Sequence, residues 1–159
     1  MDDESVDAVI SLASLRHSQQ RDAFYREAHR VLKPGGKFLI GDVERGSPQD
    51  ACLNGFVNEY NSMGHEGYFL EAEIESARMS SAGFEVIHND RHDYDWSFPD
   101  TSTMFEFCTG LFGLDQASPA ALTKGLSNLR SENTPHIINW GLLMIMESKT
   151  KLANEGEVK

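Results

Sequence analysis

The sequence predicts an α/β protein with a sheet of about four strands, mostly parallel, one late antiparallel strand and an inserted helical hairpin. Short apolar runs alternate with amphipathic segments along the 159 residues, a pattern typical of strands that alternate with helices. The first two runs, 6–12 and 37–43, are joined by a helical segment rather than a tight turn. That connection indicates a parallel crossover.

The first third of the chain follows the order strand, helix, strand. VDAVISL (6–12) is apolar and contains Val and Ile, which favours a buried strand. Apolar residues recur on one face of 19–32 and predict a helix. The sequence Lys33-Pro34-Gly35-Gly36 predicts the end of that helix, and KFLIGDV (37–43) predicts the second strand.

The later elements are less regular, and glycine or proline separates them. In chain order we expect a helix over 49–61, a helix over 71–81, a strand from Phe84 toward Trp96, helices over 100–112 and 118–129, and a strand over 136–147. These elements form a single domain over 1–147, with a helical insertion at about 100–131. The polar segment 148–159 is expected to be a frayed tail.

Composition excludes several functions. There are 25 Asp and Glu against 14 Lys and Arg, for a net charge of −11. Such a surface repels phosphate backbones and anionic lipids, so we expect neither nucleic acid nor a membrane as partner. The acidic N-terminus is unlike a secretory signal. Cys52 and Cys108 stand outside any paired motif, which predicts no disulfide framework and a cytoplasmic location.

Three stretches carry a family resemblance: DAVIS (7–11), EAHRVLKPGG (27–36) and AGFEV (82–86). They resemble small-molecule, type 11-like, class I S-adenosylmethionine-dependent methyltransferases. The resemblance implies a Rossmann-like sheet in which 6–12 is the fourth strand and 37–43 the fifth. It implies S-adenosylmethionine as cofactor, and 94–114 resembles the substrate-side insertion of such enzymes.

The sequence departs from that family in one respect. The glycine-rich loop after the first strand and the acidic residue that binds the ribose cannot be placed, because Gly35-Gly36 precedes a strand. We therefore expect only the C-terminal half of the fold, and a chain that alone neither binds S-adenosylmethionine nor is active. The alternative is a non-enzymatic dimeric remnant or interaction module without cofactor.

The resemblance also predicts a homo-oligomer. The family's fourth strand lies inside the sheet, whereas here Val6–Leu12 would form an apolar edge. Exposed apolar edges recruit partners. Two copies paired around a two-fold axis would close this edge.

Candidate cofactor-binding and catalytic residues follow the expected fourth strand. The resemblance places Leu12, Ala13 and Ser14 beside the methyl-donor end of the cofactor, and the alternative is an ordinary turn. His17 is the candidate general base toward a hydroxyl or carboxyl group. Its alternative is a solvated loop residue.

The candidate substrate residues are Asp42, Tyr68, Trp96 and Phe98. Asp42 would end the fifth strand and orient substrate, or else cap the following turn. The aromatic side chains would line an apolar pocket or pack the helical hairpin onto the sheet.

The alternation of His88, Asp90 and His92 raises the possibility of a small metal-binding protein, because these side chains would share one face of a strand. The alternative is a polar strand near the sheet edge. No second cluster with ligand spacing accompanies the alternation, so we expect no metal site.

Overall fold

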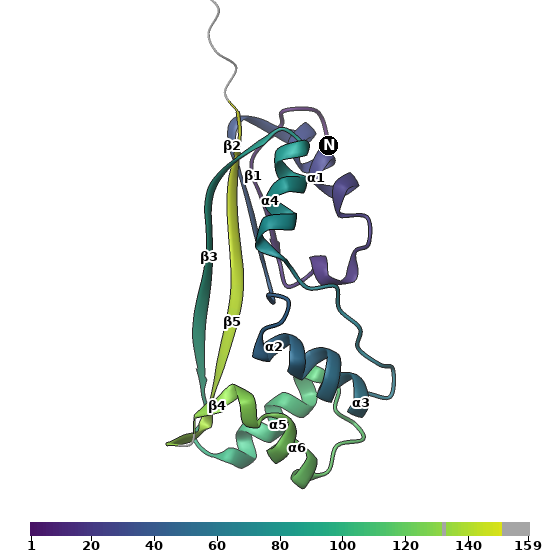
Figure 1. Cartoon of the computed structure of the whole chain (residues 1–159), viewed down its shortest axis with the longest axis vertical. Coiled ribbons are helices and arrows are strands. Elements are labelled where there is room, and N and C mark those ends of the chain that lie inside the picture. Colours follow the sequence, from purple (N-terminus) through teal and green to yellow (C-terminus); the bar gives the residue numbers. More distant parts are fainter. Residues whose placement is uncertain (132, 151–159) are drawn as a thin grey trace, which may run out of the picture.

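The computed structural model describes residues 1–131 and 133–150, so most of the expected tail, 151–159, lies outside the described residues. Within the described part, five strands form one sheet in the order β1–β2–β5–β3, and β4 pairs with β5 (Figure 1). The strands are β1 (Val6–Leu12), β2 (Leu32–Asp42), β3 (Phe84–Ser97), β4 (Arg130–Ser131) and β5 (Thr134–Lys149).

The strand directions agree with the expected topology. β1 and β2 are parallel, whereas β5 is antiparallel to both β2 and β3. β3 therefore points the same way as β1 and β2, and β5 is the late antiparallel strand between them. The predicted fold class is confirmed.

The helix α1 (Arg21–Val31) forms the crossover between β1 and β2. The helix ends just before Lys33-Pro34-Gly35-Gly36, as expected, but the expected strand start at residue 37 is wrong, because β2 already begins at Leu32. Gly35 adopts φ +78°, a conformation that glycine takes at low cost. A Cβ on Gly36 would lie 2.8 Å from the Lys33 carbonyl oxygen. The two glycines therefore let the chain pass directly from helix to strand.

The remaining helices connect the strands. They are η1 (Leu15–His17), α2 (Pro48–Asp50), the π-helix η2 (Ala51–Val57), α3 (Asn58–Tyr60), α4 (Ala72–Ser81), α5 (Thr101–Phe112), α6 (Pro119–Gly125) and η3 (Ser127–Leu129). The segments α2, η2 and α3 replace the single helix expected over 49–61. Asp100 and Ser118 cap α5 and α6 by accepting from Thr103 N–H and Ala121 N–H, and these helices form the inserted hairpin. No helix of the described part is long and apolar enough to cross a bilayer.

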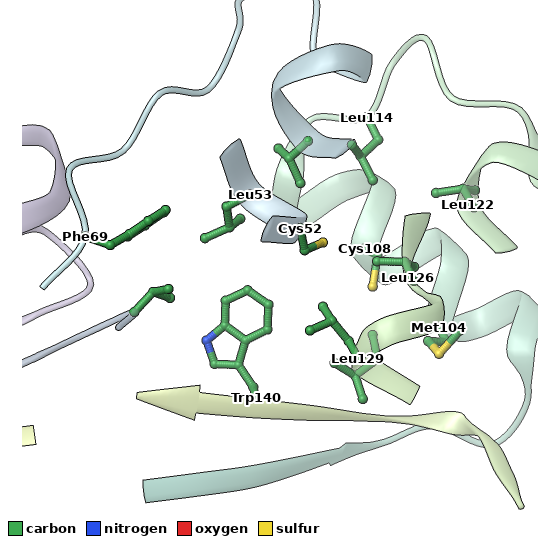
Figure 2. Close-up of a cluster of buried hydrophobic side chains, with 13 residues drawn as sticks. Cys52, Leu53, Phe69, Met104, Cys108, Leu114, Leu122, Leu126, Leu129 and Trp140 are labelled. Atoms are coloured by element: carbon green, nitrogen blue, oxygen red, sulfur yellow. The ribbon is translucent and has the colours of Figure 1, made fainter. Parts of the chain in front are cut away.

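Two apolar clusters cover opposite faces of the sheet. Leu143 and Ile145 of β5 pack with α1 and α4. Ile138 and Trp140 pack with η2, α5 and α6, as Figure 2 shows for the indole of Trp140. Successive strand residues point to opposite faces, so these pairs lie on different sides of β5. The candidate site lies on the Trp140 side.

Candidate functional site

A cavity of about 940 Å³ lies at the carboxyl ends of β1 and β2. Its lining comes from the β1–α1 connection, the end of β2, the loop after α3, and parts of β3, α5 and β5. Open α/β sheets bind ligands at the carboxyl ends of their strands. The cavity is therefore where this fold is expected to hold a small molecule.

Aromatic side chains form one wall of the cavity. Trp96 of β3 and Trp140 of β5 stack with ring centroids 4.7 Å apart, and Phe112 of α5 stacks against Trp140 at 5.5 Å. Phe107, also on α5, meets Trp96 edge to face at 5.8 Å. We call these four residues the aromatic wall. It is suited to flat or cationic ligands.

The turn after β1 also borders the cavity. Leu12 and Ala13, two of the candidate cofactor-binding residues, line it. Ala13 has a φ of +50°, and its N–H donates to the Gly41 carbonyl oxygen at 2.7 Å. Ser14 is not among the lining residues, and its hydroxyl lies 2.7 Å from the Ser11 hydroxyl. The turn thus brings two of the three predicted residues to the cavity.

Asp42 lines the cavity, and its carboxylate also organises the neighbouring loop. Oδ1 accepts from Val43 N–H at 2.9 Å and from Arg16 Nη1 at 3.2 Å. Oδ2 accepts from Arg16 N–H at 3.2 Å. Asp42 is almost completely buried, so this pairing compensates the cost of burying a charge. The carboxylate therefore fixes the loop that carries His17.

His17 lines the cavity and lies beside His65, which the sequence analysis did not select. Their ring centroids are 5.9 Å apart, with the planes at 73°. Burial lowers the pKa of His65, and the nearby positive charge of Arg16 lowers it further. The only signal for His65 in the sequence was a histidine within the glycine-rich segment SMGHEGY.

The predicted substrate residues divide between three places. Trp96 belongs to the aromatic wall. Phe98 is not a lining residue and packs against Phe107 at 5.2 Å. Tyr68 borders a separate polar cleft of about 660 Å³, where its hydroxyl accepts from Gln19 Nε2 at 3.2 Å. The structure therefore does not bring these side chains into one pocket.

His88, Asp90 and His92 lie on β3, at the edge of the sheet. His88 Nε2 is 3.0 Å from Asp90 Oδ2, and the two imidazole centroids are 6.3 Å apart. Across 1–131 and 133–150, no three His, Cys, Asp or Glu side chains are arranged to hold a metal ion. The metal alternative therefore gains no support from the described residues.

The family and sequence comparisons agree with each other. A family model described as a methyltransferase domain matches residues 1–40. Phosphoethanolamine N-methyltransferase 1 of Arabidopsis thaliana is 36% identical over 93 residues, covering 57% of this chain and 18% of that protein. Erythromycin 3''-O-methyltransferase of Saccharopolyspora erythraea is 34% identical over 97 residues, covering 47% of this chain and 32% of that enzyme. The chain thus matches less than a third of either relative.

Solved structures show the same fold over nearly the whole chain. A candidate methyltransferase from Bacillus halodurans aligns with a TM-score of 0.60 and 16% identity, covering 95% of this chain and 67% of that one. The YcgJ protein of Bacillus subtilis aligns with a TM-score of 0.54 and 15% identity, covering 96% and 67%. At these identities the likeness concerns the fold alone.

Proposed function

We propose that this chain, which belongs to the class I S-adenosylmethionine-dependent methyltransferases, forms the acceptor side of a site that methylates a small molecule. The observation that carries the proposal is the position of the cavity. It lies at the carboxyl ends of β1 and β2, and both the aromatic wall and His17 line it.

The cavity fits the charged, methyl-bearing end of S-adenosylmethionine. A sulfonium ion is a soft cation, and aromatic faces attract cations when water is excluded. Leu12 and Ala13 would contact the donor from the β1 side, while Asp42 adds a negative charge nearby. The residues named here offer no acid for the ribose hydroxyls, since both Asp42 oxygens are already engaged. We therefore propose that this chain alone does not hold the cofactor.

Each cavity residue has a role in the proposed reaction. When bound, the cofactor supplies an activated methyl group, so the protein mainly orients the acceptor and excludes water. The aromatic wall would contact the sulfonium and also hold the acceptor next to it, and His17 would take a proton from the acceptor. Asp42 and Arg16 would keep the His17 loop in place.

Trimethylsulfonium tests this proposal without relying on ribose or methionine contacts. NMR shift titration of the chain should place its binding at the aromatic wall, and tert-butanol serves as an uncharged probe of similar size. We expect the cation to bind about threefold more tightly, from the usual size of cation–π interactions. Equal affinity, or shifts centred elsewhere, would overturn the proposal.

A second candidate function is a dimeric interaction module without cofactor. β1 is an edge strand that pairs with β2 alone in the described sheet. Ile10 and Leu12 on it are 63% and 54% exposed, and Ile10 lies level with Leu39 and Met146 on the same face. We propose that a second copy covers this apolar edge.

Sedimentation tests the dimer directly. The native chain should sediment as a dimer and Ile10→Lys as a monomer, with Thr123→Lys on α6 as a charge-matched control. A monomeric native chain would eliminate this candidate.

We further propose a cytoplasmic location. Cys52 and Cys108 are free thiols, and both are buried in the apolar cluster that contains Trp140.

A further inference from the structure

His65 is held in the cavity by a loop that is hydrogen-bonded on both sides of it. The His65 backbone N–H donates to Asn58 Oδ1 at 2.6 Å. Two residues later, Gly67 N–H donates to Asn54 Oδ1 at 2.8 Å, and Asn54 Nδ2 donates to the Gly67 carbonyl oxygen at 3.0 Å. Gly64 turns the chain with a φ of +71°. The imidazole therefore has a defined place beside His17.

The surroundings of His65 indicate which nitrogen carries its proton. Nδ1 is buried, and within the described residues it has no hydrogen-bond partner. A proton on Nδ1 would create a buried donor without an acceptor, which is costly. Burial lowers the pKa of His65 most, and the charges of Arg16 and His17 lower it further, whereas an interaction with its own backbone and the more weakly acting carboxylate of Asp42 raise it. The favoured form is the neutral imidazole with its proton on Nε2.

We propose that the two histidines divide the work on the acceptor: His65 donates its Nε2–H to the acceptor oxygen, and His17 removes the proton from that oxygen. This inference rests on the proposed function and names its substrate class, a small molecule with a hydroxyl group on a flat apolar ring. The ring would lie along the aromatic wall, and the hydroxyl would reach the histidine pair.

The proton step is balanced without any further reactant. The acceptor O–H bond breaks, the proton forms a bond to the free imidazole nitrogen of His17, and the electron pair stays on oxygen. The resulting oxyanion accepts the hydrogen bond from His65, and hydrogen bonds to charged groups are the stronger kind. Imidazole centroids 5.9 Å apart are close enough for one oxygen to contact a nitrogen of each ring.

The first measurement is the tautomer and titration of each histidine in the native chain. Long-range proton–nitrogen NMR spectra on histidine-labelled protein would be recorded from about pH 5 to about pH 9, across the usual histidine range. The variants His65→Gln and His17→Gln assign the signals. We expect His65 to be the Nε2–H tautomer and to protonate below the usual histidine pKa, because burial lowers its pKa. A His65 that carries its proton on Nδ1, or that protonates at or above the usual histidine pKa, would overturn the division of roles.

The second measurement uses 4-nitrophenol, whose absorbance reports its ionisation. Bound probe should be more ionised than free probe at the same pH. His65→Phe should reduce the ratio of bound phenolate to phenol about tenfold, the usual effect of a hydrogen bond to a charged group. His65→Gln, which keeps an N–H donor, should retain most of the ionisation, and His92→Gln on β3 should change nothing.

The outcomes separate this inference from the proposed function. If 4-nitrophenol does not bind, the substrate class is wrong. If it binds and His65→Phe leaves its ionisation unchanged, His65 only packs against His17. In either case, binding of trimethylsulfonium at the aromatic wall still supports the methyltransferase proposal. If trimethylsulfonium does not bind there, the methyltransferase proposal fails whatever 4-nitrophenol does.

Discussion

Trp96 and Trp140 stack nearly parallel, with centroids 4.7 Å apart and planes 17° from each other, across the β3–β5 ladder. Their neighbours in the ladder fix this contact, because Trp96 lies opposite Ile138 and Tyr94 lies opposite Trp140. The two strands flank the helical insertion in the sequence, so the stack joins the two ends of that insertion. The aromatic wall therefore depends on correct pairing of β3 with β5.

Replacing Trp96 by leucine separates the role of the wall in binding from its role in packing. Trp96→Leu should lower the free energy of unfolding by about 1 kcal/mol, the usual size of an aromatic pair interaction. It should also weaken trimethylsulfonium binding about threefold, since one cation-binding face is lost. Denaturant titration and NMR shift titration measure the two effects.

Phe98→Leu is the matched control, because Phe98 packs near Trp96 and does not line the cavity. It should reduce stability and leave sulfonium binding unchanged. A Trp96→Leu chain that is destabilised but binds the cation normally would show that the wall has no part in recognition.

Glu147 of β5 is completely buried opposite Phe38 of β2. Both of its carboxylate oxygens are buried without a hydrogen-bond partner within 1–131 and 133–150, and burial raises its pKa to about 7. The folded state therefore binds a proton more tightly than the unfolded state. Stability should fall by about 3 kcal/mol as the pH rises from about 4.5, the unfolded value, to about 7.

Glu147→Met removes the buried charge with little change in length. The variant should unfold at higher denaturant concentration than the native chain at pH 8, and it should lose this pH dependence. Urea titrations at about pH 5 and about pH 8 measure both effects. If native chain and variant respond to pH equally, another group controls the pH dependence.

The buried pair of Arg21 on α1 and Glu75 on α4 joins two helices on the other face of the sheet. Tyr25 donates to the same carboxylate at 2.5 Å. Glu75→Gln would leave the Arg21 charge buried without its counter-ion, so we expect a loss of about 3 kcal/mol in unfolding free energy. Glu71→Gln should cost less than about 1 kcal/mol, because its pair with Arg45 is exposed. Equal losses in urea titrations would contradict the assigned role of burial.

The order of helices and strands could be predicted from the sequence. Apolar runs mark the strands, and glycine, proline and capping residues mark where elements begin and end. The runs at 6–12 and 37–43 correspond to β1 and β2, and Ser118-Pro119 marks the start of α6. The start of β2 at Leu32 was missed, because proline and two glycines normally interrupt regular structure. Here Gly35 takes a positive φ inside β2, where the register with β1 is interrupted between Leu32 and Lys37.

The site was only partly predictable, because some of its residues are placed by a strand end and others by long-range side-chain hydrogen bonds. Leu12 ends β1, and Ala13 and His17 lie within the next five residues, so the end of that strand largely determines their position. His65 reaches the cavity through side-chain hydrogen bonds from Asn54 and Asn58, which leave no periodic pattern in the sequence. Tyr68 belongs to the same connection but lies three residues farther along, where the chain has turned toward the polar cleft.

We propose that the cavity receives a sulfonium methyl group in contact with both the aromatic wall and the β1 turn. Intermolecular nuclear Overhauser effects between trimethylsulfonium and the protein test it most directly. The account predicts cross-peaks from the probe methyl protons to ring protons of Trp96 and Phe112 and to the methyl groups of Leu12. Cross-peaks to Ile10 without any to Trp96 and Phe112, or the absence of cross-peaks from a saturated complex, would contradict it.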